Sequence, residues 1–123
     1  MAKRVLVVDD EPAIANLAKV KLTNDGFDVV TAHSGKEALE KVASEPPDVI
    51  VLDVMMPGMD GWEVASRLRG NPATKDIPIL MLTALGIPEE RVPGLPDIDE
   101  YYTKPFEAAT LVKLVRRLGG ERD

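Results

Sequence analysis

Three aspartates follow short apolar segments of the sequence, and their positions suggest a shared chemical site. Asp9 and Asp10 come directly after the apolar residues 5–8, and Asp53 comes directly after residues 49–52. Apolar runs of this length, bounded by turn residues, are typical of strands buried on both faces of a parallel sheet. The carboxyl ends of parallel strands share one edge, where ligands bind in open α/β sheets. We therefore expect the three carboxylates to meet at that edge.

Two further polar residues follow later candidate strands. Thr83 ends the apolar run of residues 77–82, and Lys104 follows the short segment 99–103. Mg²⁺ prefers hard oxygen ligands, and it would offset the repulsion between neighbouring carboxylates. Carboxylates also attack phosphorus to form aspartyl phosphates. Asp53 is therefore a candidate nucleophile, with Thr83 and Lys104 as candidate groups that stabilise a phosphoryl oxygen.

Each of these residues also has an ordinary structural explanation when it is taken alone. Asp10 precedes Pro12, and this pairing suits the N-cap and first turn of a helix. Asp53 could be a solvated turn residue, and single threonines and lysines more often have no function. The joint placement at the ends of alternating segments favours a phosphate or metal site over these separate explanations.

The rest of the chain predicts the elements that position these side chains. Strands are expected at residues 4–8, 27–31, 49–53, 77–82 and 99–103. Helices are expected at about residues 12–24, 36–43, 62–69 and 107–118, with a short or irregular one within 85–98, where three prolines interrupt the pattern. Apolar spacing places Ile14, Leu17, Ala18 and Leu22 on the inward face of the first helix. Strands that alternate with helices predict an α/β fold with a five-stranded parallel sheet covered on both faces.

Composition limits the function classes. The 123 residues predict a single domain, residues 1–123, with its core in residues 3–118 and a short tail at 119–123. The net charge of −6 argues against direct binding to nucleic acid or to an anionic membrane. The chain has no cysteine, which excludes disulfides and thiolate metal sites. The first apolar run is too short for a signal peptide, and no segment reaches membrane-spanning length, so a cytoplasmic protein is expected.

Together, these motifs resemble the response-regulator receiver domain (the CheY-like module), which is the phosphoacceptor of two-component signalling. The matching segments are VVDDEP at residues 7–12, LDVMMPGMDG at 52–61, LTA at 82–84, Tyr101, and KPF at 104–106. The resemblance covers residues 3–118. It implies a doubly wound, flavodoxin-like (βα)5 fold with strand order 2-1-3-4-5.

The resemblance also implies a role for each site residue. Asp53 would be the phosphoacceptor, Asp10 would bind Mg²⁺ directly, and Asp9 would assist, directly or through water. The backbone carbonyl of Met55 would be a further Mg²⁺ ligand. The remaining implied roles are phosphoryl binding by Thr83 and the Ala84 N–H, an ion pair from Lys104, a cis Lys104–Pro105 peptide bond, and a switch in which Tyr101 moves inward as Thr83 shifts.

The function implied by the resemblance is a switch that accepts phosphate from a sensor histidine kinase or a phosphotransfer protein. The phosphorylated form would change its affinity for a downstream protein and would lose the phosphate slowly. The chain would thus catalyse only its own phosphorylation and dephosphorylation. Thr110 and Leu114 stand where the winged-helix receiver class has Glu and Arg, so a monomer or a weak phosphorylation-dependent dimer is expected.

Some features leave alternatives open. The segment 91–99 is one residue shorter than usual for the family, and its prolines are compatible with a phosphorylation-independent interaction domain on the same fold. An aspartyl-phosphate phosphatase is disfavoured, because Met55 stands where such enzymes commonly have a second acid. Dinucleotide binding is disfavoured, because no G-x-G-x-x-G follows the first strand. We interpret His33, Trp62 and the pair Arg116–Arg117 as structural or solvated residues.

Overall fold

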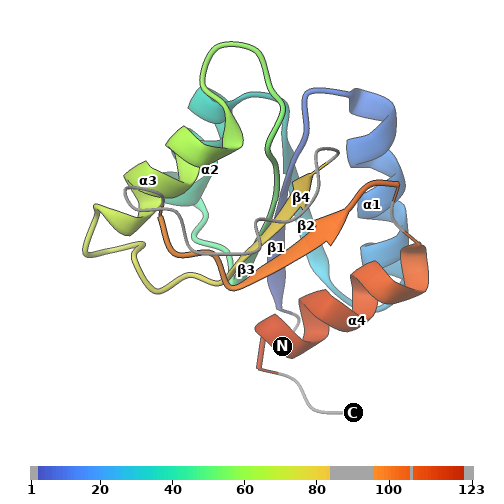
Figure 1. Cartoon of the computed structure of the whole chain (residues 1–123). Coiled ribbons are helices and arrows are strands. Elements are labelled where there is room, and N and C mark those ends of the chain that lie inside the picture. The colour runs from blue at the N-terminus through green and yellow to red at the C-terminus, as the bar shows by residue number, and fades with distance from the viewer. Residues whose placement is uncertain (1–2, 84–95, 106, 121–123) are drawn as a thin grey trace.

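The computed structural model describes residues 3–83, 96–105 and 107–120, in which one sheet carries helices on both faces (Figure 1). The five strands are all parallel and lie in the order β2-β1-β3-β4-β5. The strands are β1 (Arg4–Val8), β2 (Asp28–Ala32), β3 (Val49–Asp53), β4 (Ile79–Thr83) and β5 (Glu100–Thr103). The helices are α1 (Pro12–Asn24), α2 (Gly35–Ser44), α3 (Gly61–Arg69) and α4 (Ala108–Leu118). The predicted fold class and strand order are confirmed.

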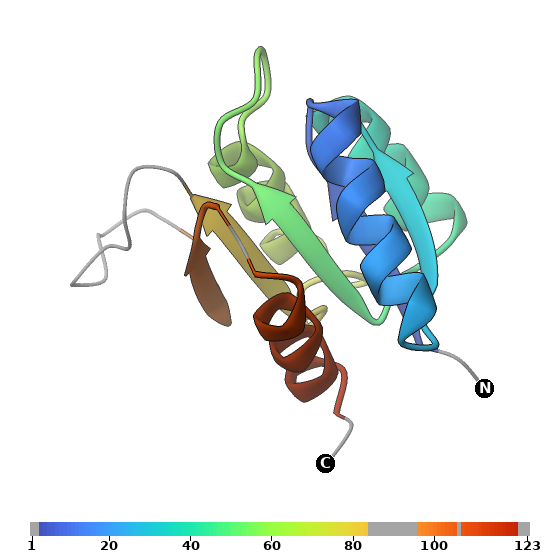
Figure 2. The ribbon, with the colours of Figure 1, turned by 90° about the vertical axis from the view of Figure 1, so that its right-hand side faces the viewer.

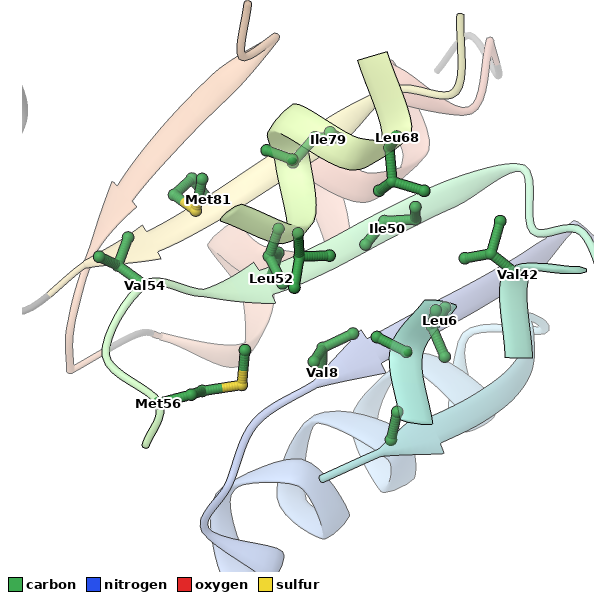
Figure 3. Packing of buried hydrophobic residues seen from close by; sticks show 14 residues of the cluster. Leu6, Val8, Val42, Ile50, Leu52, Val54, Met56, Leu68, Ile79 and Met81 are labelled. Carbon is green, nitrogen blue, oxygen red and sulfur yellow. The ribbon is translucent and has the colours of Figure 1, made fainter. Parts of the chain in front are cut away.

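The three central strands bury both faces, as their unbroken apolar sequences predict. In β3, for example, Ile50 and Leu52 point into a core under α2 and α3, whereas Val49 and Val51 point into a second core under α1 and α4. Figure 3 shows the first core from close by, and Figure 2 shows helices lying on both sides of the sheet. Because successive side chains of a strand alternate between faces, one apolar run supplies both cores.

The inward face of α1 differs from the prediction. Its buried residues are Ala15, Ala18 and Leu22, whereas Leu17 is 45% exposed. Ile14 is only partly buried. Ala18 and Leu22 are thus buried as predicted, whereas the small residue Ala15 takes the inward place expected for Leu17.

The predicted start of α1 is also corrected. The N-cap is Glu11, and no side chain caps the helix, so Asp10 is not the N-cap. Instead, the Glu11 N–H donates to Asp9 Oδ1 at 2.9 Å. The ordinary structural explanation for Asp10 therefore fails.

Three strands start one or two residues later than the sequence pattern predicts. In β2 the difference has a clear cause, because the Phe27 N–H donates to Leu22 O and so still belongs to the end of α1. Gly26, just before it, has φ of 100°, as expected for a left-handed helix cap. The helix predicted within 85–98 lies largely outside the described residues.

The loop after β3 is fixed by Asp60 and Gly61. Asp60 is the N-cap of α3, and its Oδ1 accepts from the Glu63 N–H at 2.9 Å. A Cβ on Gly61 would collide with Asp53 O and lie 2.8 Å from Val54 Cα. Only glycine lets α3 begin this close to the end of β3, so this residue helps to determine where Asp53 lies.

Candidate functional site

The carboxyl edge of the sheet brings together the three aspartates that the sequence singles out. Asp9 and Asp10 follow β1, and Asp53 is the last residue of β3, which is hydrogen-bonded to β1. Each aspartate offers a carboxylate oxygen, and these three oxygens lie within 4.8 Å of one another. Asp9 is 1% exposed and Asp53 is 3% exposed, so two of the three carboxylates are almost removed from solvent.

Lys104 reaches the same edge from the other end of the sequence. Its Nζ lies 3.0 Å from Asp9 Oδ2 and 3.2 Å from Asp53 Oδ1. The backbone N–H of Lys104 also donates to Thr83 O at 2.9 Å, which ties the end of β5 to β4. The Lys104–Pro105 peptide bond is cis. One ammonium group thus balances part of the charge of two buried carboxylates.

The electrostatics of the site shift the pKa of Asp53 upwards. Burial is the largest cause, followed by the negative charge of Asp9, while Lys104 and the Met55 N–H act in the opposite direction. Burial acts to lower the pKa of Lys104, but its hydrogen bond to Asp9 and the charges of Asp53 and Asp9 outweigh this and raise it. Lys104 therefore stays charged at neutral pH, and an ionised Asp53 is held at a free-energy cost.

The site fits a hard divalent cation. All of its anionic groups are carboxylates, which are the ligands that Mg²⁺ prefers. Three carboxylates near one ammonium leave excess negative charge in a poorly solvated place, and a cation would neutralise it. Asp9, Asp10 and Asp53 are the described residues that would hold the ion.

The structure also places the other predicted site residues. Thr83 is the buried last residue of β4, the strand that lies between β3 and β5. The Met55 N–H donates to Asp53 Oδ1 at 3.4 Å, while the Met55 side chain is 55% exposed. Tyr101 lies on β5, and its ring centroid is 6.1 Å from that of Trp62. Ala84 lies outside the described residues.

Sequence reasoning did not anticipate the position of His33. Its ring Nδ1 lies 3.1 Å from the backbone carbonyl of Asp9, and the backbone N–H of His33 donates to Glu37 Oε1. The available signal was its position, because it directly follows β2, which is paired with β1. His33 thus supports the backbone of the site.

The fold and site define a doubly wound α/β protein with a carboxylate-rich centre at the strand ends. Comparison with known proteins gives the family. The family model described as "Response regulator receiver domain" matches residues 5–116 of the chain. The chain therefore belongs to the receiver domain family of two-component response regulators.

Individual relatives agree with this assignment. The response regulator MprA of Mycobacterium tuberculosis (strain ATCC 25618 / H37Rv) is 46% identical over 119 residues, covering 96% of this chain and 51% of MprA. The chain thus spans about half the length of that relative. Among solved structures, the Francisella response regulator 1452 receiver domain has 36% identity and a TM-score of 0.84, with 96% of this chain and 97% of that chain covered. Chemotaxis protein CheY4 of Vibrio cholerae has 35% identity and a TM-score of 0.82, with 96% and 99% covered.

No helix in the described part of the chain has both the length and the apolar character needed to cross a membrane.

Proposed function

We propose that this chain is a phosphorylation-activated switch whose phosphoacceptor is Asp53. The observation that carries the proposal is the position of Asp53, which ends the central strand β3 beside the carboxylates of Asp9 and Asp10, with Lys104 Nζ 3.2 Å away. The receiver family supports the same role. The donor would be a phosphohistidine on a sensor histidine kinase or a phosphotransfer protein.

The chemistry is an in-line transfer between two nucleophiles. An Asp53 carboxylate oxygen forms a bond to phosphorus while the bond from phosphorus to the donor nitrogen breaks, and that nitrogen keeps the electron pair. Lys104 neutralises charge on the transferred group, and Thr83 with the Ala84 N–H binds its oxygens. Water later attacks the phosphorus slowly, the bond from phosphorus to the Asp53 oxygen breaks, and inorganic phosphate leaves with the free carboxylate restored. The protein thus catalyses only its own phosphorylation and dephosphorylation.

Mg²⁺ would be held by Asp10 and Asp53, by Asp9 directly or through water, and by the Met55 carbonyl. When bound, it supplies positive charge that allows Asp53 to remain ionised while an anionic phosphoryl group approaches. The acidic donor set and the raised pKa of Asp53 support this assignment. Asp53 should accordingly react only in the presence of Mg²⁺.

The phosphorylated form would bind a downstream protein with altered affinity. Tyr101 would carry the change by moving inward as Thr83 shifts towards the phosphoryl group. We propose a cytoplasmic protein that contacts neither nucleic acid nor membrane through this domain. It would be a monomer, or a weak dimer that forms on phosphorylation.

The test is incubation with Mg²⁺ and acetyl phosphate, followed by intact mass spectrometry. One phosphoryl adduct is expected on the unmodified chain and none on Asp53→Asn. The matched control is Asp76→Asn, which removes the same charge from an exposed position. An adduct that persists in Asp53→Asn would refute the assignment.

The alternative is an interaction domain that works without phosphorylation. It would be favoured if a binding partner showed the same affinity for Asp53→Ala and for the phosphorylated and unphosphorylated forms of the natural chain.

A further inference from the structure

Arg69 forms a cluster of contacts at the opposite edge of the sheet from the carboxylate site. It is the last residue of α3, and its side chain is 17% exposed. A basic residue in the last turn commonly interacts with the terminal carbonyls of its own helix. Arg69 instead reaches into the loops that precede β4 and β5.

The guanidinium uses four of its five N–H groups. Nε donates to Asp97 O at 2.9 Å, Nη1 donates to Lys75 O at 2.8 Å and Ile77 O at 2.7 Å, and Nη2 donates to Asp99 Oδ2 at 2.8 Å. The same Asp99 oxygen accepts from the Ile79 N–H at 2.8 Å. These contacts connect the end of α3 and the first residue of β4 to the residue just before β5.

β5 needs such an anchor more than the other strands do. It has four residues, none of them fully buried, and β4 is its only partner among the strands that the structure describes. Its side chains therefore contribute less apolar burial to fix the alignment than the completely buried β3 and β4. Asp99 occupies the position immediately before the strand, and its hydrogen bond from the Ile79 N–H joins the start of β5 to the start of β4.

The alignment of β5 determines where Lys104 lies, because Lys104 directly follows the strand. A slip of two residues would keep the same faces inward but would move Lys104 by about 7 Å along the strand. This displacement is more than twice the 3.0 and 3.2 Å that separate Lys104 Nζ from Asp9 and Asp53. Smaller shifts would lengthen the same contacts.

We propose that Arg69 is a positioning residue for the phosphorylation chemistry: its bridge to Asp99 holds β5 in the register that brings Lys104 to Asp53. Arg69 touches no reacting group and acts through Lys104. The inference rests on the proposed phosphoacceptor role of Asp53, but its structural part can be measured separately.

The first experiment measures the rate of Asp53 phosphorylation by acetyl phosphate, together with Mg²⁺ affinity. Arg69→Met is expected to lower the rate about tenfold, since small misplacements of a charged group are costly in a transition state. Mg²⁺ affinity should be unchanged or tighter, because the carboxylates remain and their ammonium partner is loosened. Arg67→Met is the control; it removes an arginine from the same helix whose exposed guanidinium pairs only with Glu63 among the contacts shown. Equal rates in the two variants, or a parallel loss of Mg²⁺ affinity, would overturn the proposal.

The second experiment separates positioning from general stability. In a Lys104→Met background, Arg69→Met should cause no further decrease in rate, because its effect passes through Lys104. Independent effects that multiply in the double variant would contradict the proposal. Arg69→Lys should not restore the rate, since an ammonium lacks the planar fork that makes these contacts. If Arg69→Met does not fold, Asp99→Asn replaces it and should lower the rate in the same direction.

The third readout is independent of phosphorylation. The Lys104 N–H donates to Thr83 O, so its hydrogen exchange reports whether the end of β5 stays on β4. Exchange should be faster in Arg69→Met than in Arg67→Met, and equal exchange would refute the positioning role. If the natural chain acquires no phosphate, the proposed function fails, and this measurement still decides whether Arg69 positions Lys104.

Discussion

Lys104 and Asp9 are separated by 95 positions in the sequence, and their side chains form a 3.0 Å ion pair at the carboxyl edge of the sheet. The pair joins the end of β1, the first strand in the sequence, to the end of β5, an edge strand of the sheet. Asp53 lies between them on β3 and shares the same ammonium group. The charge balance of the site therefore depends on the complete sheet, and this dependence leads to measurable expectations.

Replacement of Asp53 by asparagine should stabilise the protein in the absence of Mg²⁺. Burial, and then Asp9, raises the pKa of Asp53 above its ordinary value of 3.8, so the folded chain binds this proton more tightly than the unfolded chain. The ionised carboxylate costs stability above the raised pKa. At neutral pH, Asp53→Asn should increase the free energy of unfolding by about 1 kcal/mol.

The stabilisation by Asp53→Asn should also depend on pH. As pH falls from the raised pKa towards 3.8, Asp53 becomes protonated in the natural chain, and the advantage of Asp53→Asn should disappear. Urea unfolding at a series of pH values measures both quantities. Asp76→Asn, at an exposed position, should show no comparable gain at neutral pH, and a constant advantage at every pH would rule out the electrostatic cause.

Mg²⁺ should stabilise the fold through the carboxylate trio. At a free concentration about 100 times the dissociation constant, one-site binding adds about 2.7 kcal/mol to the free energy of unfolding. Asp10→Asn should lose most of this gain. Glu11→Gln removes the neighbouring charge, which lies outside the trio, and should keep the gain in denaturant unfolding with and without Mg²⁺. Similar behaviour of the two variants would argue against a specific site.

Removal of the Lys104 charge should destabilise the protein, and Mg²⁺ should reverse most of the effect. Lys104→Met leaves Asp9 and Asp53 buried without their ammonium partner. We expect a loss of about 2 kcal/mol in the free energy of unfolding without Mg²⁺. The control is Lys113→Met on the exposed side of α4, which should change stability little. A loss that persists unchanged in saturating Mg²⁺ would show that packing, not charge, is responsible.

Gly61→Ala should disturb both stability and the site. The new methyl group would collide with Asp53 O and contact Val54 Cα, and the overpacking should cost about 1–3 kcal/mol. Phosphorylation should slow as well, because the backbone of Asp53 must move. Gly70→Ala is the matched control, since its nearest contact would be Ser66 O at 3.3 Å. Thermal unfolding and the acetyl phosphate assay distinguish the two, and a site unaffected by Gly61→Ala would contradict the close-approach argument.

The fold was largely predictable because the central strands are uninterrupted apolar runs and the turns contain proline or glycine. The strand ends then placed Asp9, Asp10, Asp53, Thr83 and Lys104 at one edge without any three-dimensional information. The strand order came from family resemblance, since spacing alone does not distinguish among parallel arrangements.

What the sequence did not reveal depends on contacts between distant segments. Leu17 reads as a core residue, yet α1 packs through the smaller Ala15 and Ala18. Arg69 reads as an ordinary basic residue at a helix end, and its carbonyl partners are backbone atoms that no residue type identifies. For His33, nothing local in the sequence indicates that its ring would meet the Asp9 carbonyl.

The separation of Lys104 from the aspartates has a consequence during protein synthesis. The ribosome completes all three acids by residue 53 and reaches Lys104 about fifty residues later. An emerging chain therefore carries the full set of metal-binding acids well before it carries the cation that balances them. The chain would become able to carry out the proposed signalling reaction only when β5 and Lys104 have been added. Chains that end before this point would therefore transmit no signal.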